Sequence, residues 1–376
     1  PGKKLVREFF EANRGDFELN ELDSLFDSAV EDYSVTEDVM AGYLLGRLDS
    51  PTLRVIGGVR YEHTKNDIRA NTVTLIEEDG TLPDGTTADD DTVIVAPNQF
   101  KRNSDDWLPR LTIRWAPQVS LVLRAAAYKS LVRPKLSKLA PRFTIEQNDD
   151  DEREGEFGNP DLKAYKAWNF DTSVEYYLPG NGAISAGFFY KKISTYVQTI
   201  TTIAPYASTG LPVALLEGTG VNANDDFSIT NVINTPGGPL KGFELNYQQP
   251  LDFLPDMFRG FGLLANYTYV DSSIDYFATT AAGAAKINAP LLNLSKNAAN
   301  ATLYYERGKI QARVSVNYRD KYLTAVPGRY NQDVQGNLST TFFDGSASYK
   351  VTDQLSVSVD ALNLTNEKDI SYIDST

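Results

Sequence analysis

The alternation of apolar and polar side chains over residues 168–178 most constrains what this chain can fold into. One parity carries Trp168, Phe170, Thr172, Val174, Tyr176 and Leu178, and the other carries Asn169, Asp171, Ser173 and Glu175. Successive side chains of a strand point to opposite faces, so the two parities predict one apolar and one polar environment. Soluble strands usually have about 5–6 residues, whereas a tilted strand that crosses a bilayer needs about 9–11 residues. The segment therefore has the length of a membrane-spanning strand.

The same two-residue period recurs along most of the chain. It is clear in residues 241–249, 309–319 and 354–362, where apolar side chains oppose Glu, Asn, Gln, Ser or Arg. Counting such segments from residue 34 to residue 364 gives about twelve strands, with no helical period between them.

Short and long connections alternate between these predicted strands. Short links lie near residue 50, near residue 117, and at 178–182, 306–309 and 351–354. Long polar stretches lie at about 68–104, 132–163, 201–238, 273–291 and 323–338. Bacterial outer-membrane barrels have short periplasmic turns and long extracellular loops. We therefore predict an all-β fold, an antiparallel transmembrane β-barrel, because a sheet in hydrocarbon must pair every backbone polar group.

The barrel prediction assigns an environment to each face of the strand at 168–178. Phe170, Val174 and Tyr176 are expected to contact lipid, and Asn169, Asp171 and Glu175 are expected to line the interior. Lipid of the outer membrane is thus one predicted partner.

Composition excludes several other classes of protein. The chain has no cysteine and no apolar run long enough for a transmembrane helix. Its net charge is −14, from 36 Lys and Arg against 50 Asp and Glu, so nucleic acid is not expected as a partner.

Six further segments follow one another in a characteristic order, at residues 157–179, 182–194, 240–255, 262–272, 297–322 and 355–369. In this order they resemble the TonB-dependent outer-membrane transporters. In addition, YKSLVRPKLSKLAP at 128–141 is similar to the Arg-Pro loop of a large proteobacterial subfamily often linked to carbohydrate uptake. The resemblance implies a barrel of about 22 strands with an N-terminal plug inside it. It also implies a short box, before the plug, that binds TonB.

The chain departs from that family pattern in three respects. About twelve strands are predicted, nothing resembles a plug or a TonB box, and the end lacks a final strand with a terminal aromatic residue. Residues 1–376 are therefore expected to be a partial barrel domain, with the plug domain and the final strands absent from this chain.

The resemblance implies an outer-membrane receptor that binds a scarce solute and imports it with energy from the TonB system. A carbohydrate is the favoured small-molecule ligand and a siderophore is the second candidate. The implied partners are TonB and its inner-membrane energising complex, acting through a plug not present here. A passive porin-like channel and a soluble β-sandwich adhesin or sugar-binding module are the alternatives from other classes.

Candidate ligand-binding residues lie in or beside the long loops. Aromatic rings there could stack on sugars, although rings at a barrel rim are more often interfacial anchors. The candidates are Arg133 of the Arg-Pro loop, Tyr206, Tyr276, Phe277, Tyr322 and Tyr330. The lone His63 and the acidic run at 148–156 lack the spacing of a metal or catalytic site. No catalytic residue, metal or cofactor is predicted, and an enzyme is not indicated.

Overall fold

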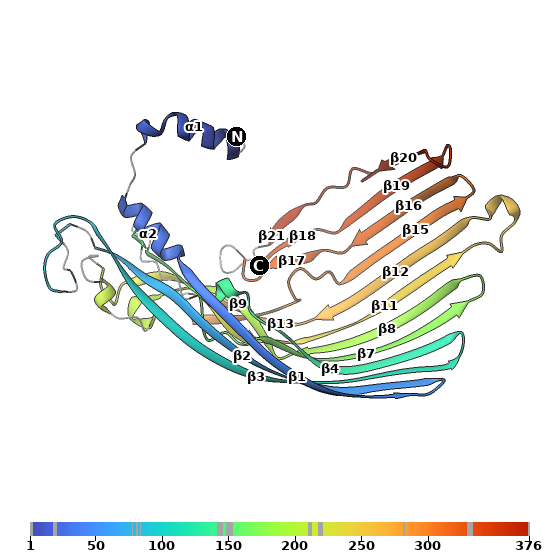
Figure 1. Ribbon diagram of the computed structural model, residues 1–376, viewed down its shortest axis with the longest axis horizontal. Coiled ribbons are helices and arrows are strands. Elements are labelled where there is room, and N and C mark those ends of the chain that lie inside the picture. Colours follow the sequence, from blue (N-terminus) through green and yellow to red (C-terminus); the bar gives the residue numbers. More distant parts are fainter. Residues whose placement is uncertain are drawn as a thin grey trace.

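The largest element of the fold is one curved antiparallel sheet of twelve strands (Figure 1). The computed structural model describes residues 3–17, 21–76, 78–79, 82, 84–140, 146–147, 153–209, 213–216, 221–280, 283–328 and 334–374. In sheet order the strands are β1 (Tyr33–Asp49), β2 (Leu53–Ile76), β3 (Thr92–Gln118), β4 (Leu121–Val132), β7 (Tyr165–Leu178), β8 (Gly182–Ile193), β11 (Pro239–Pro250), β12 (Phe261–Ser272), β15 (Asn297–Arg307), β16 (Ile310–Arg319), β19 (Thr340–Lys350) and β20 (Ser356–Ala361). The predicted strand number and the all-β antiparallel class are both confirmed.

Tight turns join the strands at one end of the sheet, on the right of Figure 1. Between β7 and β8, Gly180 and Asn181 have φ values of 72° and 61°. Glycine adopts this left-handed region without steric cost, and asparagine tolerates it better than most residues. The turn between β15 and β16 likewise contains Gly308 with φ of 60°. The connection between β11 and β12 is longer and contains the short helix η5 (Asp256–Phe258).

The predicted loop at 68–104 is wrong over much of its length. Strands β2 and β3 continue to pair as far as Ile76 opposite Thr92, so the hairpin extends well beyond the other strands. Its outer part reads as polar in sequence, yet Ile68, Val73 and Ile76 are buried there. Burial of these side chains explains why the ladder persists where the alternation weakens.

The remaining long connections, together with the segment after β20, form sheets of their own. A four-stranded sheet has the order β5-β6-β10-β9, β13 pairs with β14, and β17-β18-β21 form a third sheet. These strands are β5 (Glu146–Gln147), β6 (Arg153–Phe157), β9 (Thr195–Pro205), β10 (Asp226–Pro236), β13 (Ile274–Thr280), β14 (Gly283–Ala289), β17 (Tyr322–Ala325), β18 (Val334–Asn337) and β21 (Ser371–Asp374). Strand β6 pairs with β10 in parallel, which joins two loops that are distant in sequence.

Two helices precede the sheet, α1 (Lys3–Ala12) and α2 (Glu21–Glu31). Helix α2 lies beside β2, where the Asn71 side chain donates a hydrogen bond of 3.1 Å to the Ala29 carbonyl. No helix among the described residues combines the length and the apolar character needed to cross a membrane. Short 3-10 helices occur at η1 (Arg14–Asp16), η2 (Leu136–Lys138), η3 (Tyr206–Thr209) and η4 (Val213–Leu216).

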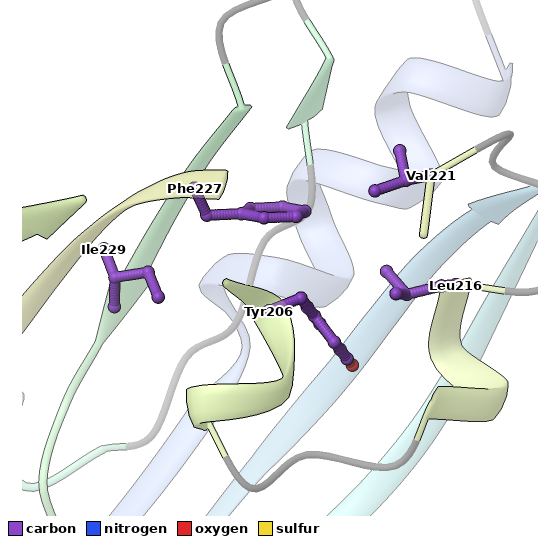
Figure 2. Packing of buried hydrophobic residues seen from close by; sticks show 5 residues of the cluster. All are labelled: Tyr206, Leu216, Val221, Phe227 and Ile229. Carbon is purple, nitrogen blue, oxygen red and sulfur yellow. The ribbon is translucent and has the colours of Figure 1, made fainter. Parts of the chain in front are cut away.

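Two clusters of buried apolar side chains lie in the long connections. The first contains Tyr206, Leu216, Val221, Phe227 and Ile229, whose side chains converge in Figure 2. The second contains Ile274, Tyr276, Ala289 and Val326. Many apolar side chains of the twelve-stranded sheet, such as Phe170, Phe188 and Val314, are instead exposed. Exposed apolar side chains in such number are suited to a lipid environment.

Candidate functional site

Strand register assigns the side chains of the sheet to two chemically distinct faces. Val174 lies opposite Leu123 on one neighbouring strand and opposite Ala186 on the other. The adjacent Glu175 accepts a hydrogen bond of 2.7 Å from Arg124 Nε, so it belongs to the other face. We call the face of Val174 the apolar face and the face of Glu175 the polar face. The sheet therefore has the two faces that the alternation predicts.

The polar face carries side-chain hydrogen bonds between successive strands. They join Asn246 to Ser185 at 3.4 Å, Asn300 to Asn266 at 2.9 Å, Thr302 to Ser315 at 2.8 Å, Arg313 to Ser346 at 2.9 Å and Asn317 to Asp344 at 3.4 Å. Buried polar groups need hydrogen-bond partners within the protein, and partly exposed polar groups can also form hydrogen bonds with water. A face of this kind is suited to a water-filled interior through which a polar solute passes.

Aromatic side chains bracket the apolar face at two heights. Three strands each carry a pair of rings on this face, and the two rings of every pair are eight positions apart in the sequence. The pairs are Trp107 and Trp115 on β3, Trp168 and Tyr176 on β7, and Tyr269 and Phe261 on β12. That separation corresponds to about 26 Å of extended chain, or roughly 20 Å of height at a tilt near 40°. Amphipathic rings favour the two membrane interfaces. The rows therefore delimit a band close to the apolar thickness of an outer-membrane barrel.

A hollow of about 550 Å³ opens between the polar face and the loop end of strands β12, β15, β16 and β19. Its lining includes Asn293, Ser295, Arg319, Tyr322 and Asp369. The Arg319 guanidinium carbon lies 3.7 Å from the centroid of the Tyr322 ring. Arg319 also donates to Ser295 Oγ and to the Asn293 carbonyl, each at 2.8 Å. These contacts fix a planar cation and an aromatic ring in one orientation.

Tyr322 is thus the predicted site residue that lines this hollow. Arg319 was not among the predicted residues, although the period of β16 assigns it to the polar parity with Asn317. That parity, together with the position of Arg319 at the loop end of a strand, was a sequence signal that could have identified it as a site residue. A hollow with an aromatic ring, amides and a fixed guanidinium can hold a polar solute through both ring contact and hydrogen bonds.

The structure does not support a ligand-stacking role for Tyr206. Its side chain is fully buried, with 0% exposure, and lies 5.6 Å from the Phe227 ring within the cluster of Figure 2. Burial raises the pKa of the Tyr206 hydroxyl to about 12. A ring without exposed surface has no face for a sugar. Tyr206 instead stabilises the connection between β9 and β10.

Tyr276 is also fully buried, so its ring likewise presents no exposed face for stacking. Its hydroxyl donates to the Pro290 carbonyl at 3.1 Å and accepts from the Leu292 amide at 3.2 Å. Burial raises the pKa of that hydroxyl. The neighbouring Phe277 is half-buried, and its backbone is held by both amide atoms of Gln198, at 2.7 and 2.9 Å. These contacts connect the β13–β14 hairpin to β9.

Arg133 makes its contacts with carboxylates of the protein. Its Nη2 donates to Glu62 Oε2 at 2.6 Å and to Thr64 Oγ1 at 3.0 Å, and its Nε lies 3.7 Å from Glu37 Oε2. The contacts attach the start of the Arg-Pro loop to β1 and β2. The described candidates are therefore dispersed over separate loops, and Tyr330 lies outside the described residues.

Comparison with known proteins extends the match over nearly the whole chain. Residues 7–364 match the sequence model of the family described as TonB dependent receptor-like, beta-barrel. No curated protein sequence matches the chain.

Three solved structures illustrate the structural similarity. The ferric enterobactin receptor PfeA of Pseudomonas aeruginosa has a TM-score of 0.54 at 15% identity, covering 89% of this chain and 48% of that chain. The hemophore receptor HasR of Serratia marcescens has a TM-score of 0.57 at 17% identity, covering 90% and 51%. The ferric-catecholate import receptor Fiu of E. coli K12 has a TM-score of 0.56 at 12% identity, covering 89% and 41%. The chain thus spans about half the length of these receptors, and the similarity at such identities concerns the fold.

Proposed function

The chain belongs to the TonB dependent receptor-like, beta-barrel family, whose members reside in the bacterial outer membrane, and from this premise we propose that it serves active import of a scarce solute. In this proposal the long loops and the polar face bind the solute. TonB and its inner-membrane complex supply the energy through a plug domain. The observation that carries the proposal is the continuous polar face, which runs across the strands opposite an apolar face of bilayer height.

Energy must come from outside the barrel in this proposal. A channel equilibrates a solute across the membrane, so accumulation against a gradient requires an input of free energy. The sequence has no phosphate-binding loop of the kind that nucleotide hydrolysis uses. A partner that pulls on the receptor is therefore the proposed source of energy.

We favour a carbohydrate as the solute class. The hollow beside Tyr322 combines a ring with hydrogen-bonding groups of Asn293, Ser295 and Asp369. Sugars present apolar ring faces and a rim of hydroxyl groups, so they match this combination. A ferric siderophore is the second candidate, because the structures named above as similar include receptors for ferric enterobactin and ferric catecholates.

Uptake measurements in whole cells test the import proposal. Cells that carry the protein should accumulate the labelled solute, and deletion of TonB or collapse of the proton gradient should abolish accumulation while surface binding persists. A panel of neutral oligosaccharides and ferric siderophores, each tested for binding first, identifies the solute class. Uptake that continues at the same rate without TonB would assign the protein to the passive channels.

A further inference from the structure

Two lysines flank Trp168 on the apolar face, at the loop end of the sheet. The register sets Lys129 of β4 directly opposite Trp168 of β7, and Trp168 directly opposite Lys192 of β8. Directly opposed residues share a face and lie about 5 Å apart, so the two lysine backbones lie about 10 Å apart with the indole between them. The three side chains form one row across three adjacent strands.

This row lies at the upper limit of the apolar band. Trp168 is 43% exposed and stacks on Phe170 at 6.3 Å, and Phe170 is 6.4 Å from Tyr190. These rings are on the side of the band nearer the long connections, because β7 runs from Tyr165 at the loop end to Leu178 at the tight turn. The row therefore faces the headgroup region of the leaflet on the loop side.

Lys129 and Lys192 have no ion-pair partner among the described residues, whereas several other lysines at the loop end of the sheet have one. Lys241 lies 3.6 Å from Asp271, Lys296 lies 3.9 Å from the same carboxylate, and Lys166 pairs with Asp106. The chain as a whole has a net charge of −14, so two uncompensated ammonium groups at one position are a local exception. Their positive charge has no counterion within the described part of the sheet.

We propose that Lys129, Trp168 and Lys192 bind the phosphate-bearing headgroup of a lipid in the leaflet on the loop side. Each ammonium offers three donors, and its alkyl stem can lie along the apolar face while the charge remains at the interface. The indole N–H adds a donor at headgroup height. Acyl chains of the same lipid would contact Phe170 and Tyr190 below. The partner is therefore a single anionic lipid molecule, and this inference is independent of the solute that the protein imports.

Trp168 provides the readout for a direct test. The protein is extracted from its membrane in a neutral detergent, in a background where Trp107, Trp115 and any tryptophan outside residues 1–376 are replaced by phenylalanine, so that Trp168 is the remaining tryptophan. Dibrominated phosphatidic acid should quench Trp168 at low mole fraction, whereas dibrominated diacylglycerol, which lacks the phosphate, should quench it only at much higher mole fraction. Lys129→Gln/Lys192→Gln should weaken the phosphatidic acid interaction roughly 30-fold, at about a factor of five per lysine.

A matched control removes the same charge elsewhere. Lys309→Gln/Lys350→Gln changes two lysines at the tight-turn end, where Lys350 pairs with Asp353 at 2.9 Å, and should leave the quenching unchanged. Equal quenching by the two lipids, or an unchanged midpoint in Lys129→Gln/Lys192→Gln, would overturn the proposal. Displacement of the lipid by millimolar inorganic phosphate would instead assign the site to free phosphate. Native mass spectrometry of retained phosphatidic acid repeats the comparison without any tryptophan substitution.

Discussion

At the scale of single residues, the position of Val174 on the apolar face should not accept a charged side chain. The side chain lies between Trp168 and Tyr176 along β7, within the band that the aromatic rows delimit. Val174→Arg should lower the free energy of unfolding by about 1–2 kcal/mol, because the position lies between the centre of the band and the Tyr176 row, and the cost of an arginine falls from about 2–4 kcal/mol at the midplane to about 0–1 kcal/mol near the interfaces. The measurement is equilibrium unfolding of the protein in lipid vesicles. Ser185→Arg is the control, because Ser185 lies opposite Glu175 on the polar face and an arginine there gains a partner.

Spin labels at positions 174 and 175 test the same assignment without a charge. A label at 174 should collide mainly with oxygen dissolved in lipid, and a label at 175 mainly with a water-soluble nickel chelate. Equal accessibility at both positions would contradict the two-face arrangement.

The residue-scale prediction for solute binding concerns Tyr322. Tyr322→Leu keeps an apolar side chain but removes the ring that contacts Arg319. It should weaken binding of the oligosaccharide that the panel identifies by about 1 kcal/mol. Tyr206→Phe is the control, since that ring is buried in a cluster away from the hollow. Isothermal titration of both variants gives the comparison. A larger loss of affinity in Tyr206→Phe than in Tyr322→Leu would instead place the binding site in the connection between β9 and β10.

At the scale of elements, the connection between β4 and β7 should be separable from the sheet. Val132 and Tyr165 are directly paired, so a short Gly-Ser linker can replace residues 134–163 while Arg133 keeps its contacts with Glu62. Membrane insertion should persist, because β5 and β6 do not belong to the twelve-stranded ladder. Solute capture should weaken.

The same replacement should expose a neighbouring element. Strand β10 loses its parallel partner β6, so the segment around Ser228 should be cleaved faster in limited proteolysis. Heat-modifiable migration in electrophoresis reports insertion in the same samples. Loss of insertion would show that this connection is needed to assemble the sheet.

The elements also show what the sequence could and could not predict. The twelve strands were predictable because lipid and water impose opposite demands on alternate residues, as at Val174 and Glu175. Beyond the bilayer that demand disappears, so the alternation does not predict the outer parts of β2 and β3. The burial of Tyr206 and Tyr276 arises from packing between distant loops, which local period does not encode. The hollow beside Tyr322 was undetectable for the same reason, because it is formed by four strands together.

At the scale of the whole molecule, the twelve-stranded sheet has two edges. Within the described residues, β1 pairs only with β2 and β20 pairs only with β19. Strand β1 is long, and its Leu44 is 77% exposed. In hydrocarbon, unpaired N–H and C=O groups along such an edge each cost several kcal/mol, and in water they pair with other chains. The edges therefore need partners before these residues can reside in a bilayer.

The last prediction follows from those two edges. Residues 1–376 expressed and refolded on their own should aggregate or form a heterogeneous mixture, because the edges of β1 and β20 remain open to other copies. Size-exclusion chromatography in detergent, combined with electrophoresis of heated and unheated samples, measures this outcome. A closed bacterial barrel refolded under the same conditions is the control for the procedure. A monodisperse, heat-modifiable product from these residues would mean that β1 and β20 pair with each other in the membrane, and that twelve strands suffice to close the barrel.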